Sequence, residues 1–427
     1  MFQELYSSLR TGGLLVLFTV AFATILVIAG CGVSASKSGG TTQEVKLLFW
    51  HTLGAAEAEA LSPMLQEFAA KNPGIKVVVE AIPFENARVK FEQAVKAGLA
   101  PDIFRSDRYW ISKFADAGYL EQLDEAISQN DIADLLPITR SSVTFHGKIW
   151  GLPHTVDCLA LLYNKAHFKE KDVTPPDDFD SFTQVARKLT APEKGRYGFF
   201  MSPDGWWFEP FLYGFGGRYF DASGTLAFRS EQTLKATHFL VDLKENLKVI
   251  PPVNFRSGAY KMMMQSFKGG QVSMIFNGTW AIRDIITGSA FKDDSGNLGV
   301  ALIPRGPVGR FSPIGCQSLV IPKGGHHFKE AVRFISFMCS SEMESAFVKH
   351  NFDIPTRKSL LKDPEIQNDP FLKPFIEQIQ NAEITENSPE SYRLYAPLED
   401  FLQKVLNGDV IPEDAIKDFE NAWKNKP

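Results

Sequence analysis

The sequence predicts an α/β protein of two or three domains or lobes, and two observations predict it. Short apolar runs of strand length alternate with amphipathic segments of helix length from residue 45 onward. The 427 residues are 44% hydrophobic and 22% charged, which is typical of a folded chain long enough for two or three domains. The net charge of −5 comes without a cluster of Lys and Arg, so the sequence excludes a broad nucleic-acid surface.

The N-terminus has the features of an export signal. Leu14 to Ala29 is an uncharged run of sixteen residues, which is short for a membrane span and long enough for a signal-peptide core. The run ends in Ile28-Ala29-Gly30-Cys31, which resembles a bacterial lipobox with Cys31 as the lipidated residue. We therefore expect residues 1–30 to be a lipoprotein signal peptide and 31–43 to be a flexible tether. An uncleaved anchor helix with a buried cysteine is the alternative.

The first folded region reads as strand, helix, strand, helix, strand, helix. Leu61, Met64, Leu65 and Phe68 recur at helical spacing, and Asn72-Pro73-Gly74 has the composition of a turn. The predicted elements, in order, are a strand over 45–50, a helix over 57–70, a strand over 75–79, a helix over 84–97, a strand over 101–104 and a helix over 109–117. This order implies parallel strands with right-handed crossovers, so ligands should bind beyond the carboxyl ends of the strands.

A second region begins near Val156 and repeats the alternation. Its predicted strands cover 157–165, 272–280, 299–304 and 318–322, and its predicted helices cover 179–189 and 233–246. Aromatic residues make up 12% of the chain, more than a core of this size requires, and several of the tryptophans follow strands or lie in loops. These aromatics are candidates for a ligand platform.

The order of the pieces resembles the extracellular solute-binding proteins of ABC sugar importers, the family of maltose- and trehalose-binding proteins. The resemblance rests on segments found in the same order along the mature chain. They are Leu48 to Thr52, Asn72 to Val77, Ala100 to Ile103 with Asp107-Arg108, Gly151 to Pro153, Leu162 to Lys165, Met274 to Trp280 and Gly408 to Phe419.

The resemblance implies a periplasmic-binding-protein-like fold, in which two α/β lobes are joined by crossing hinge strands and close on a ligand. The expected N-lobe is 44–156 plus 320–352, and the expected C-lobe is 157–319 plus 353–427. By the same resemblance, crossings are expected near 155–157, 317–322 and 352–357, and a helix over 328–338 is expected to follow the second crossing in the first lobe. The family's function then implies a substrate-binding lipoprotein in the periplasm or at the cell surface, which delivers a mono- to oligosaccharide to a permease driven by a cytoplasmic ATPase. We expect a monomer without a cofactor.

A pyranose has a face of C–H bonds and a rim of hydroxyls, so its site needs flat aromatics and bidentate polar groups. By resemblance, Trp280 is the stacking tryptophan, while Asp107 and Asp157 are the acids expected to hold hydroxyls. The other candidate ligand-binding residues are Trp206, Tyr395, Arg393, His51, Arg108 and Asp204, with Trp207, Trp110 and Glu57 as weaker ones. Asn277 and Tyr163 are expected to hold turns.

Each candidate also has a plain structural reading. Trp280, Trp206 and Trp207 could be core residues, Asp107 and Asp157 could cap a helix or pair with Arg108, and the segment around Arg393 and Tyr395 could be a solvated helix start.

Carboxylates beside aromatics are also what a secreted glycoside-acting enzyme would show, so this alternative stays open. The sequence lacks HExxH, CxxC, GxSxG and a phosphate-binding glycine loop, and its eight histidines are scattered, so no metal site is expected. With Cys31 lipidated, the three remaining cysteines cannot all pair, and stability must come from packing.

Overall fold

The structure is a computed structural model that describes residues 44–221, 223–256, 258–383 and 390–425. In it the described chain forms two α/β lobes, each built on its own sheet. The first sheet has the order β12-β11-β3-β1-β2, with β6 also paired to β11. Its strands are β1 (Val45–His51), β2 (Ile75–Ala81), β3 (Ile103–Asp107), β6 (Leu152–Cys158), β11 (Ser312–Val320) and β12 (Ala382–Glu383).

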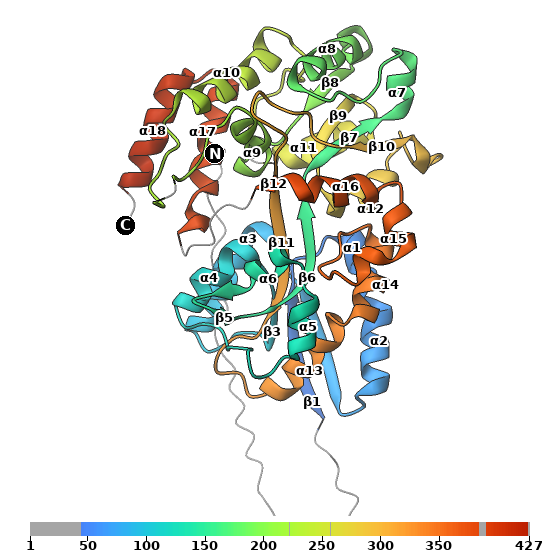
Figure 1. Cartoon of the computed structure of the whole chain (residues 1–427), viewed down its shortest axis with the longest axis vertical. Helices are drawn as coiled ribbons and strands as arrows, with labels where there is room; N and C mark the ends of the chain where they lie inside the picture. The colour runs from blue at the N-terminus through green and yellow to red at the C-terminus, as the bar shows by residue number, and fades with distance from the viewer. Residues whose placement is uncertain (1–43, 222, 257, 384–389, 426–427) are drawn as a thin grey trace, which may run out of the picture. The chain divides into compact units, whose positions relative to one another are not determined.

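The first three strands are parallel, as predicted. Val45 pairs with Ile75 and Phe49 with Ile103, so β1, β2 and β3 end at one edge of the sheet. Helices α2 (Leu61–Lys71), α3 (Phe84–Lys96), α4 (Arg108–Asp116), α13 (Phe328–Met338) and α14 (Ser341–Asn351) surround this sheet (Figure 1). Helix α13 contacts α2, β1 and β6 and places Phe334 against Phe49 and Phe68 in the first core.

The helix predicted over 57–70 is two helices, α1 (Ala55–Ala58) and α2. Pro63 lies in the first turn of α2, where its missing N–H would be unsatisfied in any case. A continuous helix would need that N–H as a donor, so the chain breaks before Leu61. The break leaves Glu57 buried at the top of the lobe, with its Oε2 accepting from Gly54 N at 2.8 Å.

The second lobe has a sheet of order β10-β7-β9-β8. Its strands are β7 (Ala160–Asn164), β8 (Tyr197–Phe200), β9 (Val272–Asn277) and β10 (Leu298–Ala301). The surrounding helices are α7 (Lys165–Glu170), α8 (Phe179–Leu189), α9 (Gly205–Gly214), α10 (Glu231–Glu245), α11 (Ala259–Lys268), α12 (Ile282–Ile286), α16 (Leu372–Gln378), α17 (Tyr395–Asn407) and α18 (Pro412–Lys424). Phenylalanines dominate this core, and Phe211 stacks on Phe276 at 5.4 Å between ring centroids.

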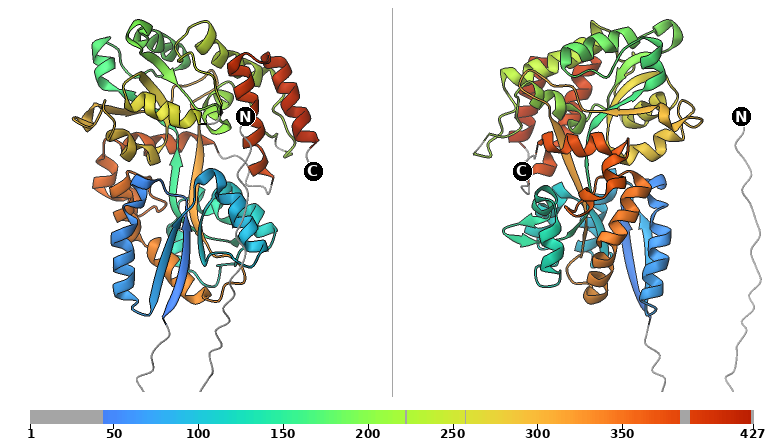
Figure 2. Two further views of the ribbon diagram at one scale, coloured as in Figure 1. Left: turned by 180° about the vertical axis from the view of Figure 1, so that it is seen from behind. Right: turned by 45° about the vertical axis from the view of Figure 1, so that its right-hand side comes forward.

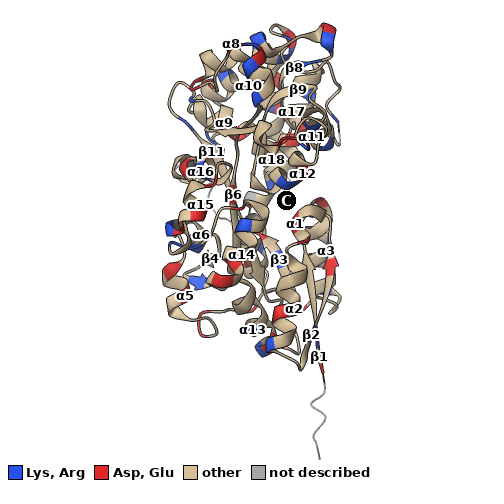
Figure 3. Cartoon of the chain, turned by 90° about the vertical axis from the view of Figure 1, so that its right-hand side faces the viewer, with Lys and Arg blue, Asp and Glu red and all other residues tan. Residues whose placement is uncertain are grey.

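Short elements complete the described chain. They are α5 (Gln129–Asp134), α6 (Pro137–Ser142), β4 (Thr144–Phe145), β5 (Lys148–Ile149) and α15 (Pro364–Asn368), with 3-10 turns that include Thr279–Ala281 and Ser391–Arg393. Lys, Arg, Asp and Glu are interspersed along both lobes (Figure 3), so neither sign of charge gathers over one element in that view.

Strands β6 and β11 run antiparallel from one lobe to the other (Figures 1 and 2). On β6, Leu152 packs in the first core and Val156 in the second. On β11, Ile314 belongs to the second core and Leu319 to the first. A third crossing follows α14, because Phe347 packs in the first core while Ile354 packs in the second and bridges Val156.

The crossing segments lie on β6, on β11 and after α14, and the bounds of these strands differ from the predicted ones. The strand expected over 318–322 in fact begins at Ser312. The prediction missed this start because Ser312 to Gln317 mixes small and polar residues without strand periodicity, although all of them are buried. The expected strand over 157–165 is interrupted at Leu159, whose N–H donates to Ser312 Oγ at 2.8 Å.

Candidate functional site

Polar side chains gather at the carboxyl edge of the first sheet, where the crossing strands leave it. Asp107 is the last residue of β3 and caps α4, with Oδ1 accepting from Tyr109 N at 2.9 Å. Its Oδ2 accepts from Gln317 Nε2 on β11 at 2.7 Å. Burial, offset in part by the Tyr109 N–H and the Arg108 charge, raises the pKa of Asp107 to about 6. The helix-capping role expected as the alternative is therefore present, at the edge where a ligand site was predicted.

Arg105 lies two residues before Asp107 on β3 and is 5% exposed. Its guanidinium joins three elements: Nη1 donates to Thr52 Oγ1 at 3.0 Å and to Gln317 Oε1 at 3.4 Å, and Nη2 donates to Thr155 Oγ1 at 3.0 Å. His51 ends β1 beside this group, and burial together with the Arg105 charge lowers the pKa of His51 to about 4. His51 is therefore neutral, with Nδ1 accepting from Leu53 N at 3.2 Å.

Asp157 lies on β6 opposite Gly315 of β11. A Cβ at residue 315 would stand 2.0 Å from Asp157 Oδ1, so the carboxylate lies against bare backbone that only glycine allows. No group in the described part of the chain donates a hydrogen bond to this carboxylate. Burial and the charge of Asp107 raise the pKa of Asp157 to about 7.

Two further acids from other segments reach the same region. Asp353 is 2% exposed on the third crossing, and its Oδ1 accepts from Thr279 Oγ1 at 2.9 Å, next to Trp280. Burial, together with the Glu57 charge, raises the pKa of Asp353 well above its ordinary value. Burial also raises the pKa of Glu57, against the opposing effect of Arg105. The charges of Glu57 and Asp157 both raise the pKa of Asp353, and the charge of Glu57 also raises the pKa of Asp157. We call Glu57, Arg105, Asp107, Asp157 and Asp353 the junction cluster.

Aromatic residues of the second lobe stand beside the junction cluster. Trp280 is partly buried, and its Nε1 donates to Tyr260 Oη at 3.0 Å. The Tyr260 ring in turn lies 5.4 Å from Trp207, whose Nε1 donates to Phe276 O at 2.7 Å. The Trp280 ring folds back over Gly278, where a Cβ would stand 1.8 Å from a ring carbon. Gly278 therefore allows the orientation of Trp280. Asn277 holds this turn as expected, with Oδ1 accepting from Gly278 N.

A second aromatic group joins the lobes directly. Tyr109 on α4 makes edge-on ring contacts with Trp206 on α9, at 6.4 Å, and with Tyr395 on α17, at 5.3 Å. Tyr395 Oη donates to Glu209 Oε1 at 3.4 Å. Trp206 and Tyr395 pack against both cores, so they are interlobe residues rather than residues of one core. Arg108 also spans the lobes, because its Nη1 donates to Ile314 O at 3.2 Å and its guanidinium lies over the Tyr109 ring.

Tyr392 forms a separate interlobe contact. The neighbouring Leu394 is fully buried in the second core, whereas the Tyr392 ring packs on the first lobe between two cations. Lys113 Nζ lies 3.9 Å from the ring centroid and the Arg88 guanidinium 4.7 Å from it. Glu92 holds both cations, at 2.6 Å from Lys113 and 2.8 Å from Arg88. We call Tyr392 with Arg88, Glu92 and Lys113 the latch.

Some of the predicted site residues lie at the lobe junction, and others lie elsewhere. Those at the lobe junction are His51, Arg108, Asp107, Asp157, Trp206, Trp280 and Tyr395. Arg393 points elsewhere, since it pairs with Glu390 and lies over the Trp423 ring of α18 at 4.9 Å. Asp204 caps α9 through Trp206 N at 2.7 Å, and burial raises its pKa to about 6. Trp110 stacks on Phe104 in the first core.

Sequence reasoning missed Arg105, Tyr109, Tyr260 and Gln317, and it considered Asp353 only as a hinge residue. One signal could have found Arg105, because a charged residue inside a short apolar strand must be held by buried partners. Gln317 and Asp353 carry no such local signal, since only the crossing of the strands brings them to the cluster.

The pattern of the chain matches a known family. A family model for bacterial extracellular solute-binding proteins matches residues 63–374. The chain belongs to this family.

Relatives of this solute-binding protein extend over most of its length. The maltotriose-binding protein of Pyrococcus abyssi is 28% identical over 371 residues, which cover 84% of this chain and 77% of that protein. A maltooligosaccharide ABC transporter solute-binding lipoprotein of Streptococcus pneumoniae is 23% identical and covers 94% of each chain. Among solved structures, the GacH receptor of Streptomyces glaucescens, studied unliganded and with acarbose, is 30% identical with a TM-score of 0.84, covering 89% of this chain and 98% of that one.

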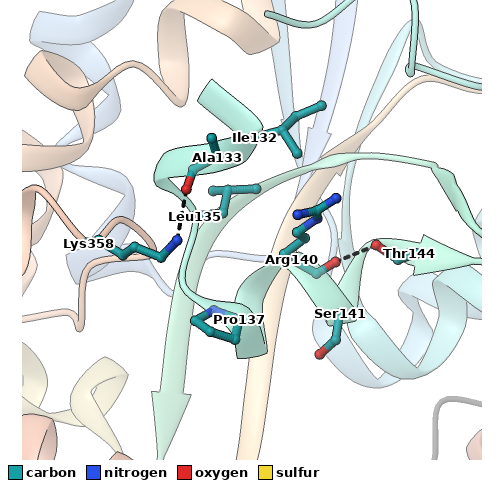
Figure 4. A pocket seen from close by; sticks show the side chains of 8 residues that line it. All are labelled: Ile132, Ala133, Leu135, Pro137, Arg140, Ser141, Thr144 and Lys358. Atoms are coloured by element: carbon teal, nitrogen blue, oxygen red, sulfur yellow. Dashed lines mark hydrogen bonds between the residues drawn. The ribbon is translucent and has the colours of Figure 1, made fainter. Parts of the chain in front are cut away.

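Two surface hollows of this solute-binding protein lie apart from the junction. One, of about 460 Å³, is lined by residues of α5, α6 and the start of β4 together with Lys358, whose Nζ donates to Ala133 O at 2.8 Å (Figure 4). The other, of about 420 Å³, lies along α11 and α12 and includes Lys268 and Asp284. None of the predicted site residues lines either hollow.

Three further findings concern the described residues alone. No group of three or more His, Cys, Asp or Glu residues among them is arranged to hold a metal ion. Cys158, Cys316 and Cys339 are buried and unbridged. Within the same residues, no helix combines the length and the apolar character needed to cross a membrane. The predicted signal peptide, the tether and Cys31 lie outside the described residues.

Proposed function

We propose that this protein is the carbohydrate-binding subunit of an ABC importer, anchored to the membrane by lipid on Cys31 at the periplasmic or outer surface. It captures a mono- to oligosaccharide between its lobes and delivers it to a permease that works with a cytoplasmic ATPase. The observation that carries the proposal is the junction cluster, an arginine with buried and partly buried acids beside Trp280, in a chain whose relatives are named for binding maltotriose and maltooligosaccharides.

The chemistry of the junction suits a sugar. Asp107, Asp157 and Asp353 can accept hydrogen bonds from hydroxyls, and Arg108 can donate to hydroxyl oxygens. Trp280 offers a flat indole for the C–H face of a pyranose, and Trp206 and Tyr395 extend the aromatic surface at the lobe contact. In this proposal, Arg393 and Asp204 contribute through the second lobe's packing, since Arg393 faces Trp423 and Asp204 caps α9.

Closure of the lobes follows from the crossings. We assign residues 44–156 plus 320–352 to the N-lobe and 157–319 plus 353–427 to the C-lobe. The core residues support a division near these positions, but each crossing strand belongs to both lobes: Val156 of the N-lobe range packs in the second core, and Leu319 of the C-lobe range packs in the first core. Ligand in the junction would contact both lobes, so it would shift the equilibrium between open and closed forms toward the closed one.

Calorimetry and thermal denaturation test the saccharide proposal. The panel is maltose, maltotriose, longer maltodextrins, trehalose, sucrose, glucosylglycerol and glycerol phosphate. We expect at least one neutral saccharide to bind with micromolar or better affinity and to raise the melting temperature. A panel in which no saccharide raises it would contradict the proposal. Release of reducing sugar by the pure protein would instead support the enzyme alternative, which the family match does not favour.

A separate experiment tests the anchor. Cells that express the full chain are grown with radiolabelled palmitate, and the protein is immunoprecipitated. We expect label in the wild type and none in Cys31→Ser, with Cys339→Ser as the control because Cys339 is buried in the first core. Label that persists in Cys31→Ser would refute lipidation at this residue.

A further inference from the structure

The surface hollow of about 460 Å³ lies where α5 and α6 meet the chain that follows the third crossing, and we call it the α5–α6 hollow. Leu136, between the two helices, donates its N–H to Thr356 O at 2.9 Å. Lys358 N donates to Asp134 O at 2.8 Å in the same way. These bonds fasten the walls of the hollow to one another, and its volume is in the range of small-molecule sites.

The lining of the α5–α6 hollow combines an aliphatic surface with two cations. Ile132 and Leu135 are 5% and 2% exposed, and Pro137 lines the hollow with them. In the view of Figure 4, the Leu135 side chain lies between the ends of the Arg140 and Lys358 side chains. None of the eight lining residues is aromatic or acidic. A ligand in the hollow would therefore meet hydrocarbon with positive charge on either side of it.

Among the lining side chains, only the two cations have hydrogen-bond donors to spare. The hydroxyl protons of Ser141 and Thr144 are taken by carbonyl oxygens of α6, at 2.8 and 2.7 Å. Lys358 Nζ uses one of its three N–H groups on Ala133 O at 2.8 Å. No group in the described part of the chain pairs with the Arg140 guanidinium. The side chains that line the hollow thus offer donors and positive charge, which suit an anion.

Two acids of α5 stand near the hollow without lining it. Asp131 Oδ1 lies 3.0 Å and Asp134 Oδ2 3.7 Å from Arg357 Nη1. Asp134 also accepts from Ser359 N at 3.0 Å. Both carboxylates are therefore held away from Arg140 and Lys358, but their charge opposes a second negative charge on a ligand. A monoanion fits this balance better than a dianion such as phosphate.

We propose that the α5–α6 hollow is a binding site for a small aliphatic monocarboxylate. The Arg140 guanidinium matches a carboxylate as a planar bidentate partner, and Lys358 adds its charge from a flexible stem. The hydrocarbon chain of the ligand packs on Ile132, Leu135 and Pro137. The site shares no residue with the lobe junction, so the inference goes beyond the proposed function and does not depend on it.

Ligand-observed NMR titrations of the purified full-length protein test the site with hexanoate as the probe. Hexanamide and hexylammonium keep the chain and change the charge, and acetate keeps the charge and loses four methylenes. The variants are Arg140→Gln and Lys358→Gln, whose parent residues are both exposed, and thermal denaturation checks that each is folded. Arg229→Gln is the control, because it removes the same charge from a residue that is 62% exposed and pairs with Glu420.

We expect hexanoate to bind the wild type with a Kd of about 1 mM or tighter. Hexanamide, hexylammonium and acetate should each bind about 10-fold or more weakly. Arg140→Gln should weaken hexanoate by about 10-fold and Lys358→Gln by about 3-fold, while Arg229→Gln binds like the wild type. A saturating saccharide from the panel should change hexanoate affinity by less than about 2-fold, because the two sites are separate.

Three results overturn the inference. Absence of saturable hexanoate binding would show that the hollow is only a solvated surface. Equal affinity for hexanoate and hexanamide, or wild-type affinity in both Arg140→Gln and Lys358→Gln, would show that these cations do not hold the carboxylate. Displacement of hexanoate by a saccharide would place the anion at the lobe junction instead. A protein that binds no saccharide contradicts the proposed function alone, since the hexanoate titrations of the variants still decide this site.

Discussion

Asp157 should cost stability in the ligand-free protein because its partly buried carboxylate lies against Gly315 without a described hydrogen-bond donor. Its pKa is about 7, against an ordinary value of 3.8. At pH values between 3.8 and about 7, the Asp157 carboxyl keeps its proton in the folded state and has lost it in the unfolded state. The free energy of unfolding therefore falls as the pH rises through this range. At about 1.36 kcal/mol for each pKa unit, the penalty is on the order of 4 kcal/mol at pH 8 and between about 1 and 2 kcal/mol at pH 5.

Asp157→Asn removes the charge and keeps the shape, so we expect it to stabilise the ligand-free protein by roughly 2 to 4 kcal/mol at pH 8 and by less at pH 5. The same variant should bind its saccharide about 10-fold or more weakly, because an acceptor for ligand hydroxyls is weakened. Urea denaturation at both pH values and calorimetry measure the two effects.

The opposite signs of the two effects make this a test of the site. Asp400→Asn is the control, because Asp400 pairs with Lys404 on the surface and should change stability by less than about 0.5 kcal/mol. A loss of stability at pH 8 in Asp157→Asn, or wild-type affinity for the saccharide, would refute the reasoning.

Three other predictions follow from named contacts. Tyr392→Ala removes the latch, so saccharide affinity should fall by about 3- to 30-fold in calorimetry because two cation–π contacts that favour closure are lost; unchanged affinity would show that the latch does not favour closure. Gly278→Ala should displace the Trp280 ring, seen as a changed tryptophan emission spectrum with weaker binding and an intact fold, whereas a wild-type spectrum would contradict the ring placement. Arg357→Ala should lower the free energy of unfolding in urea by about 3 to 5 kcal/mol. The reason is that the buried Glu344 carboxylate loses the guanidinium whose Nε lies 3.2 Å from its Oε2. A loss below about 1 kcal/mol would contradict this.

The predicted helices were most accurate where an amphipathic period was complete. The helices over 179–189 and 328–338 have the predicted bounds. The first was predicted from the sequence pattern, since an apolar stripe at helical spacing is buried on one face, and the second from the resemblance. Buried strands were less well predicted. Residues of β11 face protein on both sides, so neither alternation nor polarity marks where the strand begins.

Residues at the ends of local elements were also predictable. Asp107 follows a parallel strand, and the carboxyl end of such a strand is where a ligand is expected. Trp280 follows a strand in the same way. Arg393 does not follow a strand, so no local element indicated where its side chain would lie. In the structure it pairs with Glu390 and lies over the Trp423 ring.

By itself the sequence determined the α/β alternation, the family and the acids and aromatics that end the strands, because these depend on local periodicity and on motif order. Only the tertiary structure decided that Arg105 meets Thr155 and Gln317, that Asp353 meets Thr279, and that Tyr392 reaches Arg88 and Lys113. These contacts join residues 50 to more than 300 positions apart. Their formation depends on three crossings between the lobes, and no local pattern encodes the distance between two side chains on different segments.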